Sequence, residues 1–181
     1  MTFPKPYADA VQRLRVPGGF VLLGAFLLLS NPSLERILWG LPVSFLGLLI
    51  RAWAAGHLEK NENLTVSGPY AYVRNPLYGG SLLLAGGLVI GSRSWAVAAI
   101  FAATFLLIYL PVIQQEEQHL RKLFPAYRAY AERVPSLVPS LSPAPSDKPF
   151  RAALYGKNKE WKALSGYLIG LLYLIVRAVI G

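Results

Sequence analysis

The sequence predicts an all-α integral membrane protein with about five transmembrane helices, and three observations carry that prediction. First, 54% of the 181 residues are hydrophobic and the mean hydropathy is +0.42, which is more apolar sequence than one soluble domain of this length can bury. Second, only 15% of the residues are charged, compared with roughly 25% in soluble domains. Third, Lys and Arg gather in alternate polar segments between the apolar runs.

Five apolar runs define the expected helices. The first extends from about Gly18 to Ser30 and follows a polar segment, 1–17, that resembles the basic start of a signal peptide. Because no clear small-x-small cleavage site follows and further apolar runs come later, we expect this run to be a retained helix. The third run is short for a hydrocarbon core of roughly 30 Å unless it starts near Tyr78. The second to fifth runs are residues 37–55, 79–91, 95–113 and 164–180.

The distribution of cations predicts the orientation in the membrane. If the amino terminus is cytoplasmic, the cytoplasmic segments hold fourteen Lys and Arg residues, whereas the outer segments hold only Arg36 and Arg93. The positive-inside rule therefore predicts a cytoplasmic amino terminus and an external carboxyl terminus. The net charge of +9 is then matched to the anionic inner leaflet of a bacterial inner membrane, or another cytoplasm-facing membrane, and no nucleic-acid partner is expected.

The polar segment between the fourth and fifth runs divides into three parts. Residues 114–134 are expected to continue the fourth helix, because apolar residues recur there at helical spacing until Pro135 stops it. Residues 135–149 hold five prolines and four serines, so an extended loop is expected. Residues 150–161 are amphipathic and basic, and are expected to lie at the membrane interface before the last span.

Several functional classes are excluded by what the sequence lacks. It has no cysteine, which excludes disulfides, thiolate zinc sites and a cysteine nucleophile. Its two histidines, His57 and His119, lie far apart without metal-ligand spacing, so no metal is predicted. A strand–GxGxxG–helix unit, a P-loop and a catalytic serine signature are also missing, so a Rossmann-type fold is not expected.

The stretch 68–80 is the most chemically varied part of the chain, with three tyrosines, one arginine, one asparagine and two prolines. One interpretation is a turn-rich connector at the membrane surface, in which the tyrosines are interfacial and Arg74 snorkels to lipid headgroups. The other is a ligand-binding loop that leads into a helix, in which Arg74 clamps a carboxylate or phosphate. Asn75 before Pro76 is explained by turn chemistry alone.

Glu116 and Glu117 follow the fourth apolar run by about one helical turn. They are either a solvated helix start or acceptors for hydroxyls, an amine or a sulfonium. Adjacent helical positions point about 100° apart, so we expect the two carboxylates to do different work. Arg51 lies within the second run, near its cytoplasmic end, where it can be functional or can snorkel.

Two motifs together resemble a known family. They are Gly68-Pro69-Tyr70 with Arg74-Asn75-Pro76-Leu77-Tyr78-Gly79-Gly80, and, one helical hairpin later, Glu116-Glu117. This pattern is similar to the membrane-embedded methyltransferases that include isoprenylcysteine carboxyl methyltransferase and the phospholipid N-methyltransferases. The resemblance covers roughly residues 50–140. Family members usually have histidine at the position of Asn75. Unlike histidine, asparagine can donate a hydrogen bond but cannot act as a base.

The resemblance implies S-adenosylmethionine as methyl donor, S-adenosylhomocysteine as its product, and a membrane lipid or lipidated small molecule as acceptor. It implies a donor pocket at the cytoplasmic face, with Arg74, Glu116 and Glu117 as catalytic residues. The residues expected to bind the donor are Tyr72, Arg74, Asn75, Pro76, Tyr78, Gly80, Glu116 and Glu117. For the acceptor we expect Arg51, His57, Tyr127 and Tyr130. In detail, Arg74 pairs with the donor carboxylate, and Tyr72 and Tyr78 pack on adenine or the sulfonium.

Three parts of the chain follow from this interpretation. Residues 1–56 form the first two spans, 57–140 the catalytic core, and 141–181 a loop, an interfacial helix and the last span.

Two functions other than a methyltransferase stay open. Sterol and steroid reductases share a similar arginine-x-proline-x-tyrosine helix and use NADPH, although the Glu116-Glu117 pair argues against them. The third possibility is a non-enzymatic membrane adaptor.

Overall fold

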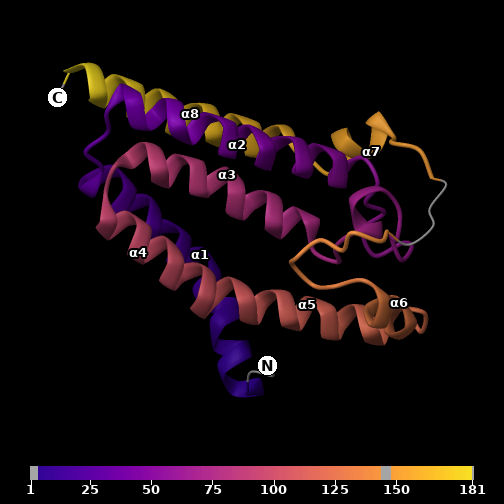
Figure 1. The fold of residues 1–181 in the computed structure, drawn as a ribbon. Helices are drawn as coiled ribbons and strands as arrows, with labels where there is room; N and C mark the ends of the chain where they lie inside the picture. Colours follow the sequence, from indigo (N-terminus) through magenta and orange to yellow (C-terminus); the bar gives the residue numbers. More distant parts are fainter. Residues whose placement is uncertain (1–3, 144–147, 181) are drawn as a thin grey trace.

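The computed structural model describes residues 4–143 and 148–180, and within these ranges the chain forms helices and no strand. Figure 1 shows the long helices running side by side, with the carboxyl terminus at one end of the bundle. The elements in chain order are α1 (Lys5–Leu29), α2 (Leu34–Ala55), a 3₁₀ turn (Gly68–Ala71), α3 (Pro76–Ser92), α4 (Trp95–Thr104), a π-helical turn (Phe105–Tyr109), α5 (Leu110–Leu123), α6 (Tyr127–Arg133), α7 (Ala152–Lys157) and α8 (Trp161–Ile180).

The described residues confirm an all-α architecture suited to a membrane. Four helical segments are long and apolar enough to cross a bilayer: Ala10–Leu29, Leu34–Ala55, Trp95–Leu123 and Trp161–Ile180. Helix α3, Pro76–Ser92, is also apolar but has 17 residues, which corresponds to a length of about 26 Å. The five expected runs are therefore four long helices and one short helix, and the short one is the third run, as the sequence predicted.

Helix α1 begins earlier than the apolar run suggested. It starts at Lys5 and passes through the polar segment that precedes Gly18, with Pro17 inside it. The other proline, Pro6, lies in the first turn, where its missing N–H would be unpaired in any case. The basic residues of this segment therefore lie on a helix.

The expected continuous helix over 114–134 is wrong. Helix α5 ends at Leu123, Phe124 adopts an extended backbone with φ −124° and ψ 108°, and α6 then begins at Tyr127. The physical cause is Pro125, because the proline ring disfavours the α conformation of the residue before it. The helical spacing of apolar residues continues across the break, so periodicity alone did not reveal it.

Helices α2 and α3 form the tightest contact in the bundle. A side-chain carbon on Gly40 would meet the Gly87 carbonyl, and one on Gly47 would meet the backbone of Leu84. The Ser44 hydroxyl also donates to the Leu84 carbonyl across the contact, at 2.9 Å. Close backbone approach through small residues is the usual way in which membrane helices associate.

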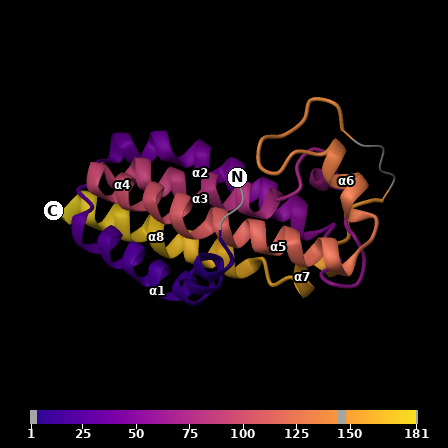
Figure 2. The same ribbon diagram turned by 90° about the horizontal axis from the view of Figure 1, so that it is seen from below.

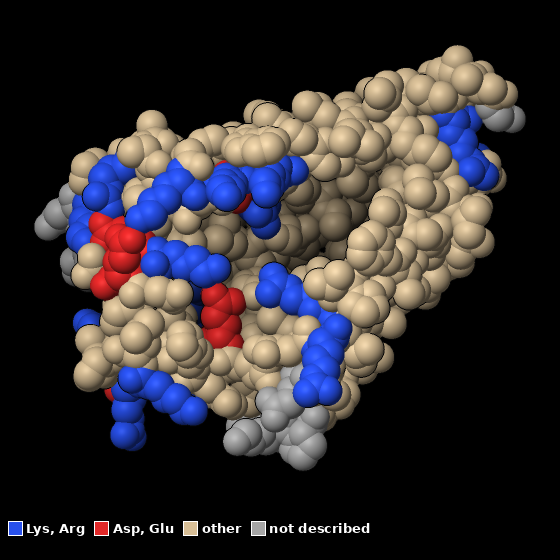
Figure 3. All heavy atoms as spheres, turned by 180° about the vertical axis from the view of Figure 1, so that it is seen from behind, with Lys and Arg blue, Asp and Glu red and all other residues tan. Residues whose placement is uncertain are grey.

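The long polar segments lie at one end of the bundle. The connecting residues 57–75, 124–143 and 148–160 are at the end opposite to the carboxyl terminus in Figures 1 and 2, whereas the short turns after α1 and α3 are at the terminus end. Figure 3 shows Lys, Arg, Asp and Glu gathered around a hollow at this polar end, beside a mostly uncharged surface. The assignment of the polar end to the cytoplasm remains a prediction from the cation count.

The segment around α7 is hydrogen-bonded to the carboxyl end of α2 and to the residues that follow it. The Arg151 amide donates to the Gly56 carbonyl at 2.9 Å, and the Asn158 side chain donates to the carbonyls of Ala55 and Leu58 at 2.9 and 3.0 Å. These bonds satisfy carbonyls that the helix end leaves without an intrahelical partner. A segment that the sequence motifs did not assign thus holds the start of the 57–65 loop.

Candidate active site

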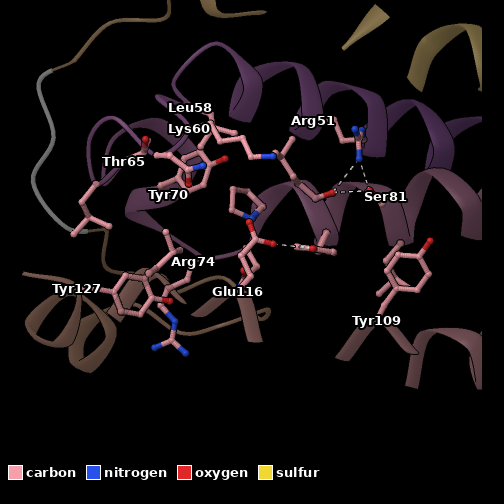
Figure 4. A pocket seen from close by; sticks show the side chains of 18 of the residues that line it. Arg51, Leu58, Lys60, Thr65, Tyr70, Arg74, Ser81, Tyr109, Glu116 and Tyr127 are labelled. Atoms are coloured by element: carbon pink, nitrogen blue, oxygen red, sulfur yellow. Dashed lines mark hydrogen bonds between the residues drawn. The ribbon is translucent and has the colours of Figure 1, made fainter. Parts of the chain in front are cut away.

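A cavity of about 450 Å³ opens between the membrane helices and the polar end. Its wall is formed by α1, α2, the 57–65 loop, α3, α4, the π-helical turn, α5 and α6, and Figure 4 shows the labelled side chains around it. The lining residues include Arg15, Leu22, Arg51, Glu59, Lys60, Thr65, Tyr70, Arg74, Asn75, Pro76, Tyr78, Ser81, Leu82, Ala85, Phe101, Phe105, Tyr109, Glu116, Leu120, Phe124, Tyr127 and Tyr130.

The two ends of the cavity differ in chemistry. At one end, the loop after α2 supplies Glu59, Lys60 and Thr65. At the other, the membrane helices supply apolar side chains, among them Phe101 and Phe105. In Figure 4, Tyr127 and Thr65 lie at one side and Tyr109 and Ser81 at the other, with Glu116 between them. The cavity therefore joins a polar, loop-lined end to an apolar, helix-lined end.

Glu117 is the buried member of the carboxylate pair and is saturated with donors. Arg74 binds it through Nε and Nη2, at 3.1 and 3.0 Å, in the bidentate geometry that suits a guanidinium. The side-chain amide of Asn75 and the hydroxyl of Ser136 both donate to Glu117 Oε1 at 2.7 Å. The remaining Arg74 amino group, Nη1, donates to the Ala131 carbonyl at 2.7 Å. This cluster ties the loop before α3 to α5 and to the segment after α6.

Backbone hydrogen bonds reinforce the same junction. The amides of Arg74 and Asn75 donate to the carbonyls of Pro135 and Ser136, at 2.8 and 3.1 Å. The Ser140 amide donates to the Tyr72 carbonyl at 2.8 Å. The proline-rich loop is therefore paired along the motif loop, which fixes where the Arg74 side chain points.

Glu116 has a different environment from its neighbour. It is exposed and lines the cavity, whereas Glu117 is buried and is not among the lining residues. The Tyr78 hydroxyl donates to Glu116 Oε2 at 2.8 Å. The expectation that the two carboxylates do different work agrees with this arrangement, because Glu117 braces the fold and Glu116 faces the cavity.

Arg51 forms a second buried ion pair at the apolar side of the cavity. Its Nε and Nη2 bind Glu160 at 2.5 and 3.0 Å, and Nη1 donates to the Ser81 hydroxyl and to the Leu77 carbonyl. The Glu160 side chain is only 8% exposed. Arg51 is thus held by a carboxylate from the residues just before α8.

Three tyrosines stand at the polar end. Tyr130 donates its hydroxyl to the Tyr70 carbonyl at 2.7 Å, and its ring meets that of Tyr127 edge to face at 5.8 Å. Burial raises the pKa of Tyr70, Tyr127 and Tyr130 well above the usual tyrosine value, and nearby carboxylates add to the effect. These phenols therefore stay protonated at neutral pH.

Most of the side chains that the sequence singled out lie around one cavity, and four do not line it. The lining ones are Arg51, Arg74, Asn75, Pro76, Tyr78, Glu116, Tyr127 and Tyr130. Tyr72 packs on Trp53 with ring centroids 6.1 Å apart, and Gly80 lies against the Arg51 side chain in the α2–α3 contact. Glu117 braces the junction described above.

His57 is buried and does not line the cavity. Its Nδ1 is 3.1 Å from the Ser67 hydroxyl, and its ring meets the edge of Phe150 at 6.3 Å. Burial, and then the charge of Arg151, lower the pKa of His57. A neutral imidazole is therefore expected at this position at neutral pH.

Sequence reasoning missed Ser81 and Glu160, which bind Arg51, and Ser136, which binds Glu117. It also missed several polar residues of the cavity lining, among them Arg15, Glu59, Thr65 and Tyr109. Glu160 stands 109 positions from Arg51. The clue that was available was an unpaired arginine within an apolar run, because such a cation needs a partner. Within the described ranges, no group of three His, Cys, Asp or Glu residues is arranged to hold a metal ion.

Two curated metal-resistance proteins are similar to this chain in sequence. The cobalt-zinc-cadmium resistance protein CzcN of Cupriavidus metallidurans is 42% identical over 94 residues, which cover 51% of this chain and 44% of that protein. The nickel-cobalt-cadmium resistance protein NccN of Alcaligenes xylosoxydans xylosoxydans is 36% identical over 108 residues, 56% of this chain and 51% of that protein. The matches thus span about half the length of these curated relatives. No solved structure matches the chain.

A family model described as phospholipid methyltransferase matches residues 38–127. This segment contains the Arg74–Glu117 pair, Glu116 and Tyr78, and most of the cavity lining. The match agrees with the resemblance seen in the two sequence motifs. Residues 38–127, about half of the chain, are thus similar to the phospholipid methyltransferase family.

Proposed function

We propose that the protein is an S-adenosylmethionine-dependent methyltransferase of the membrane, acting on a lipophilic acceptor. The observation that carries this proposal is the two-ended cavity, in which the Glu116–Tyr78 pair stands between a polar loop and an apolar surface of membrane helices. One soluble and one lipid-borne reactant can meet at such a site. The match of residues 38–127 to the phospholipid methyltransferase family supports the same reaction class.

The residues present fit the methyl donor. A volume of about 450 Å³ lies in the usual range for small-molecule sites, roughly 300–1,000 Å³. Glu116 offers an accessible carboxylate for the donor's amino group or ribose hydroxyls, and Tyr70, Tyr78 and Tyr127 offer aromatic surface. The buried Tyr127 hydroxyl has no hydrogen-bond partner among the described residues, so a polar ligand atom would satisfy it.

The bound donor supplies a methyl group on a sulfonium, which is already activated for displacement. The chain's own residues then have to position the reactants and exclude water. Glu116, oriented by Tyr78, holds negative charge beside the reacting centre. Glu117 and Arg74 hold the loop and α5 together, so that Glu116 is presented in a fixed place. In this proposal Arg74 contributes to donor binding through that brace, since Glu117 and Ala131 occupy its guanidinium.

The acceptor is proposed to enter from the apolar end. Leu22, Phe101 and Phe105 line that end from helices long enough to cross a bilayer. Leu82 and Ala85 line it from the shorter apolar helix α3. An acyl or prenyl chain would bury apolar surface there. A carboxylate acceptor would need no base, whereas an amine would have to lose a proton. We place the polar end in the cytoplasm, where the donor is found.

Calorimetry with S-adenosylhomocysteine tests the donor site. Glu116→Gln is expected to weaken binding about tenfold or more, because it removes a charge-assisted hydrogen bond. Glu132→Gln is the matched control, since Glu132 is 69% exposed on α6. Equal binding by the native protein and Glu116→Gln would contradict the site. Protection against heat by NADPH, with none by S-adenosylhomocysteine, would favour the reductase alternative.

The acceptor itself can be found with labelled donor. The purified protein, incubated with methyl-labelled S-adenosylmethionine and a total lipid extract, should transfer the label to one lipid class. Glu116→Gln, at matched protein concentration, should leave the lipids unlabelled. Label that appears equally with both proteins would show that the transfer is not made at this site.

The names of the two relatives suggest a second role, in resistance to divalent metals. We propose that such resistance would follow from methylation at the same cavity. Cells that express the native chain should then grow at higher cobalt or cadmium concentrations than cells that express Glu116→Gln at the same membrane level. Equal resistance with both chains would separate this role from the methyltransferase site.

A further inference from the structure

The hydroxyl of Tyr127 is buried and has no hydrogen-bond partner among the residues that the structure describes. The side chain is 1% exposed, yet it lines the cavity. Leaving a buried polar group unpaired is costly, so native proteins do so rarely and usually where a ligand or water completes the bond. Burial also raises the pKa of Tyr127, so the group is a neutral phenol that can donate or accept.

The ring of Tyr127 is held in place by its own neighbours. It packs edge to face on Tyr130, whose hydroxyl is in turn anchored on the Tyr70 carbonyl at 2.7 Å. Tyr127, Tyr130 and Val134 form a small core against which Leu64, Leu120 and Phe124 pack. The hydroxyl is therefore presented by a rigid aromatic cluster, and it does not depend on a bond of its own for its position.

The position of Tyr127 in the cavity points to one half of the methyl donor. Figure 4 shows Tyr127 and Tyr109 on opposite sides, with Glu116 between them. If the lipophilic acceptor occupies the apolar end, the reacting centre lies near Glu116 and the soluble donor extends toward Tyr127. Leu64, Leu120 and Phe124 pack around Tyr127 and line the cavity, beside polar residues such as Thr65. The apolar side chains suit the face of a nucleoside ring, and the polar ones suit its edge. A flat, uncharged ring can be packed against these apolar side chains at a smaller desolvation cost than a charged amino-acid group.

We propose that the Tyr127 hydroxyl binds the nucleoside half of the donor through a hydrogen bond to its polar edge. This inference rests on the proposed methyltransferase function and assigns Tyr127 to the donor, whereas the sequence had placed it with the acceptor. It predicts an unusual combination of effects. Removal of the hydroxyl should weaken binding of the donor without weakening the fold, because none of the described residues bonds to it.

Tyr127→Phe tests the proposal by calorimetry with S-adenosylhomocysteine and by thermal unfolding of the ligand-free protein. Affinity is expected to fall about five- to tenfold, the effect of losing one hydrogen bond. The unfolding temperature without ligand should stay the same or rise. Tyr155→Phe is the control, since Tyr155 does not line the cavity. An unchanged affinity in Tyr127→Phe, with binding by the native protein, would overturn the assignment.

Two donor analogues locate the bonded atom. In S-inosylhomocysteine a carbonyl replaces the adenine amino group, and in 2′-deoxy-S-adenosylhomocysteine one ribose hydroxyl is missing. The partner group is identified by an analogue that lacks it. Such an analogue should bind the native protein more weakly than S-adenosylhomocysteine does, and its affinity should be no lower than that of S-adenosylhomocysteine for Tyr127→Phe. Equal losses with each analogue in native and variant protein would exclude the adenine amino group and the 2′-hydroxyl as the partner of Tyr127. If the native protein binds no S-adenosylhomocysteine at all, the proposed function itself fails.

Discussion

Two buried arginine–glutamate pairs face the same cavity, and they are built differently. In the Arg74–Glu117 pair both residues lie within the segment that matches the family, and two further side chains donate to the carboxylate. In the Arg51–Glu160 pair the arginine lies within that segment and the glutamate lies beyond it, just before α8. The Arg74–Glu117 ion pair therefore lies wholly within the segment that matches the family. The Arg51–Glu160 ion pair links that segment to the carboxyl-terminal part of the chain.

The difference shows how the cavity is held. The first pair joins the motif loop to α5 and lies beside Glu116, so it determines the place of the proposed reacting centre. The second pair joins α2 and α3 to the segment that leads into α8, through Ser81 and Leu77. Glu117 receives four hydrogen bonds from side chains, whereas Glu160 receives two from Arg51. We expect the first pair to matter more for stability.

Glu117→Ala should have the largest effect on folding. It leaves the Arg74 guanidinium, which is 12% exposed, without its carboxylate. The expected loss is about 3–5 kcal/mol of unfolding free energy, as for other broken buried pairs. Denaturing-detergent titration followed by circular dichroism measures it. Glu116→Ala is the adjacent control, and a comparable loss there would remove the distinction between the two carboxylates.

Glu160→Ala should destabilise less. Arg51 is more exposed than Arg74 and keeps its bonds to Ser81 and Leu77, so the expected loss is about 1.5–3 kcal/mol, the range for hydrogen bonds to charged groups. The same titration gives the value. A loss larger than that of Glu117→Ala would reverse the ranking of the pairs and make the carboxyl-terminal segment the main support of the cavity.

Lysine substitutions test the geometry of each pair with the charge kept. Arg74→Lys loses the fork that binds both Glu117 oxygens and the bond to Ala131. Arg51→Lys similarly loses the fork on Glu160. Each is expected to cost about 1 kcal/mol, since lysine supplies charge without the planar donor set. Thermal unfolding of each variant beside its native parent measures the cost. Unchanged stability in both would show that charge alone is sufficient.

The smallest effect concerns Glu59, an ion-paired carboxylate outside both pairs. The hydrogen bond from Asn63, followed by those from Arg151 and the nearby Lys148 charge, lowers the pKa of Glu59 below its ordinary value of 4.5. A lowered pKa contributes stability above pH 4.5, and this contribution is lost as the pH falls through the folded-state value.

Thermal unfolding from pH 7 to pH 3.5 measures this contribution as the difference between native protein and Glu59→Gln. The native protein should be the more stable at pH 7, and the difference should shrink below pH 4.5. Glu132→Gln serves as the exposed control. A difference that grows as the pH falls would reverse the sign of the Glu59 contribution.

The fold and half of the site could be read from the sequence because their causes are local. Apolar run length predicts helices in a membrane wherever they pack. The motif around Arg74 and the Glu116-Glu117 pair were expected together, and the structure joins them through two contacts, Arg74 with Glu117 and Tyr78 with Glu116. The break at Phe124 was also local in origin, since Pro125 causes it, but the apolar periodicity that continues across it concealed it.

Other features depend on contacts between distant segments. Glu160 contacts Arg51 because the segment around α7 is hydrogen-bonded to the end of α2. Ser136 contacts Glu117 because the proline-rich loop is hydrogen-bonded to the motif loop. No periodicity or spacing encodes such contacts. The place of Tyr127, at the cavity end opposite Tyr109, likewise follows from the packing of α6.

The sequence by itself determined that this chain is helical, that it belongs in a membrane and that its polar chemistry centres on Arg74 and the glutamate pair. Hydrophobicity, proline and charge act through neighbouring residues, so they can be read along the chain. The tertiary structure alone decided which glutamate braces and which faces the cavity, and which arginine is paired with which carboxylate. Those outcomes depend on burial and on distances between segments, and only the packed helices set both.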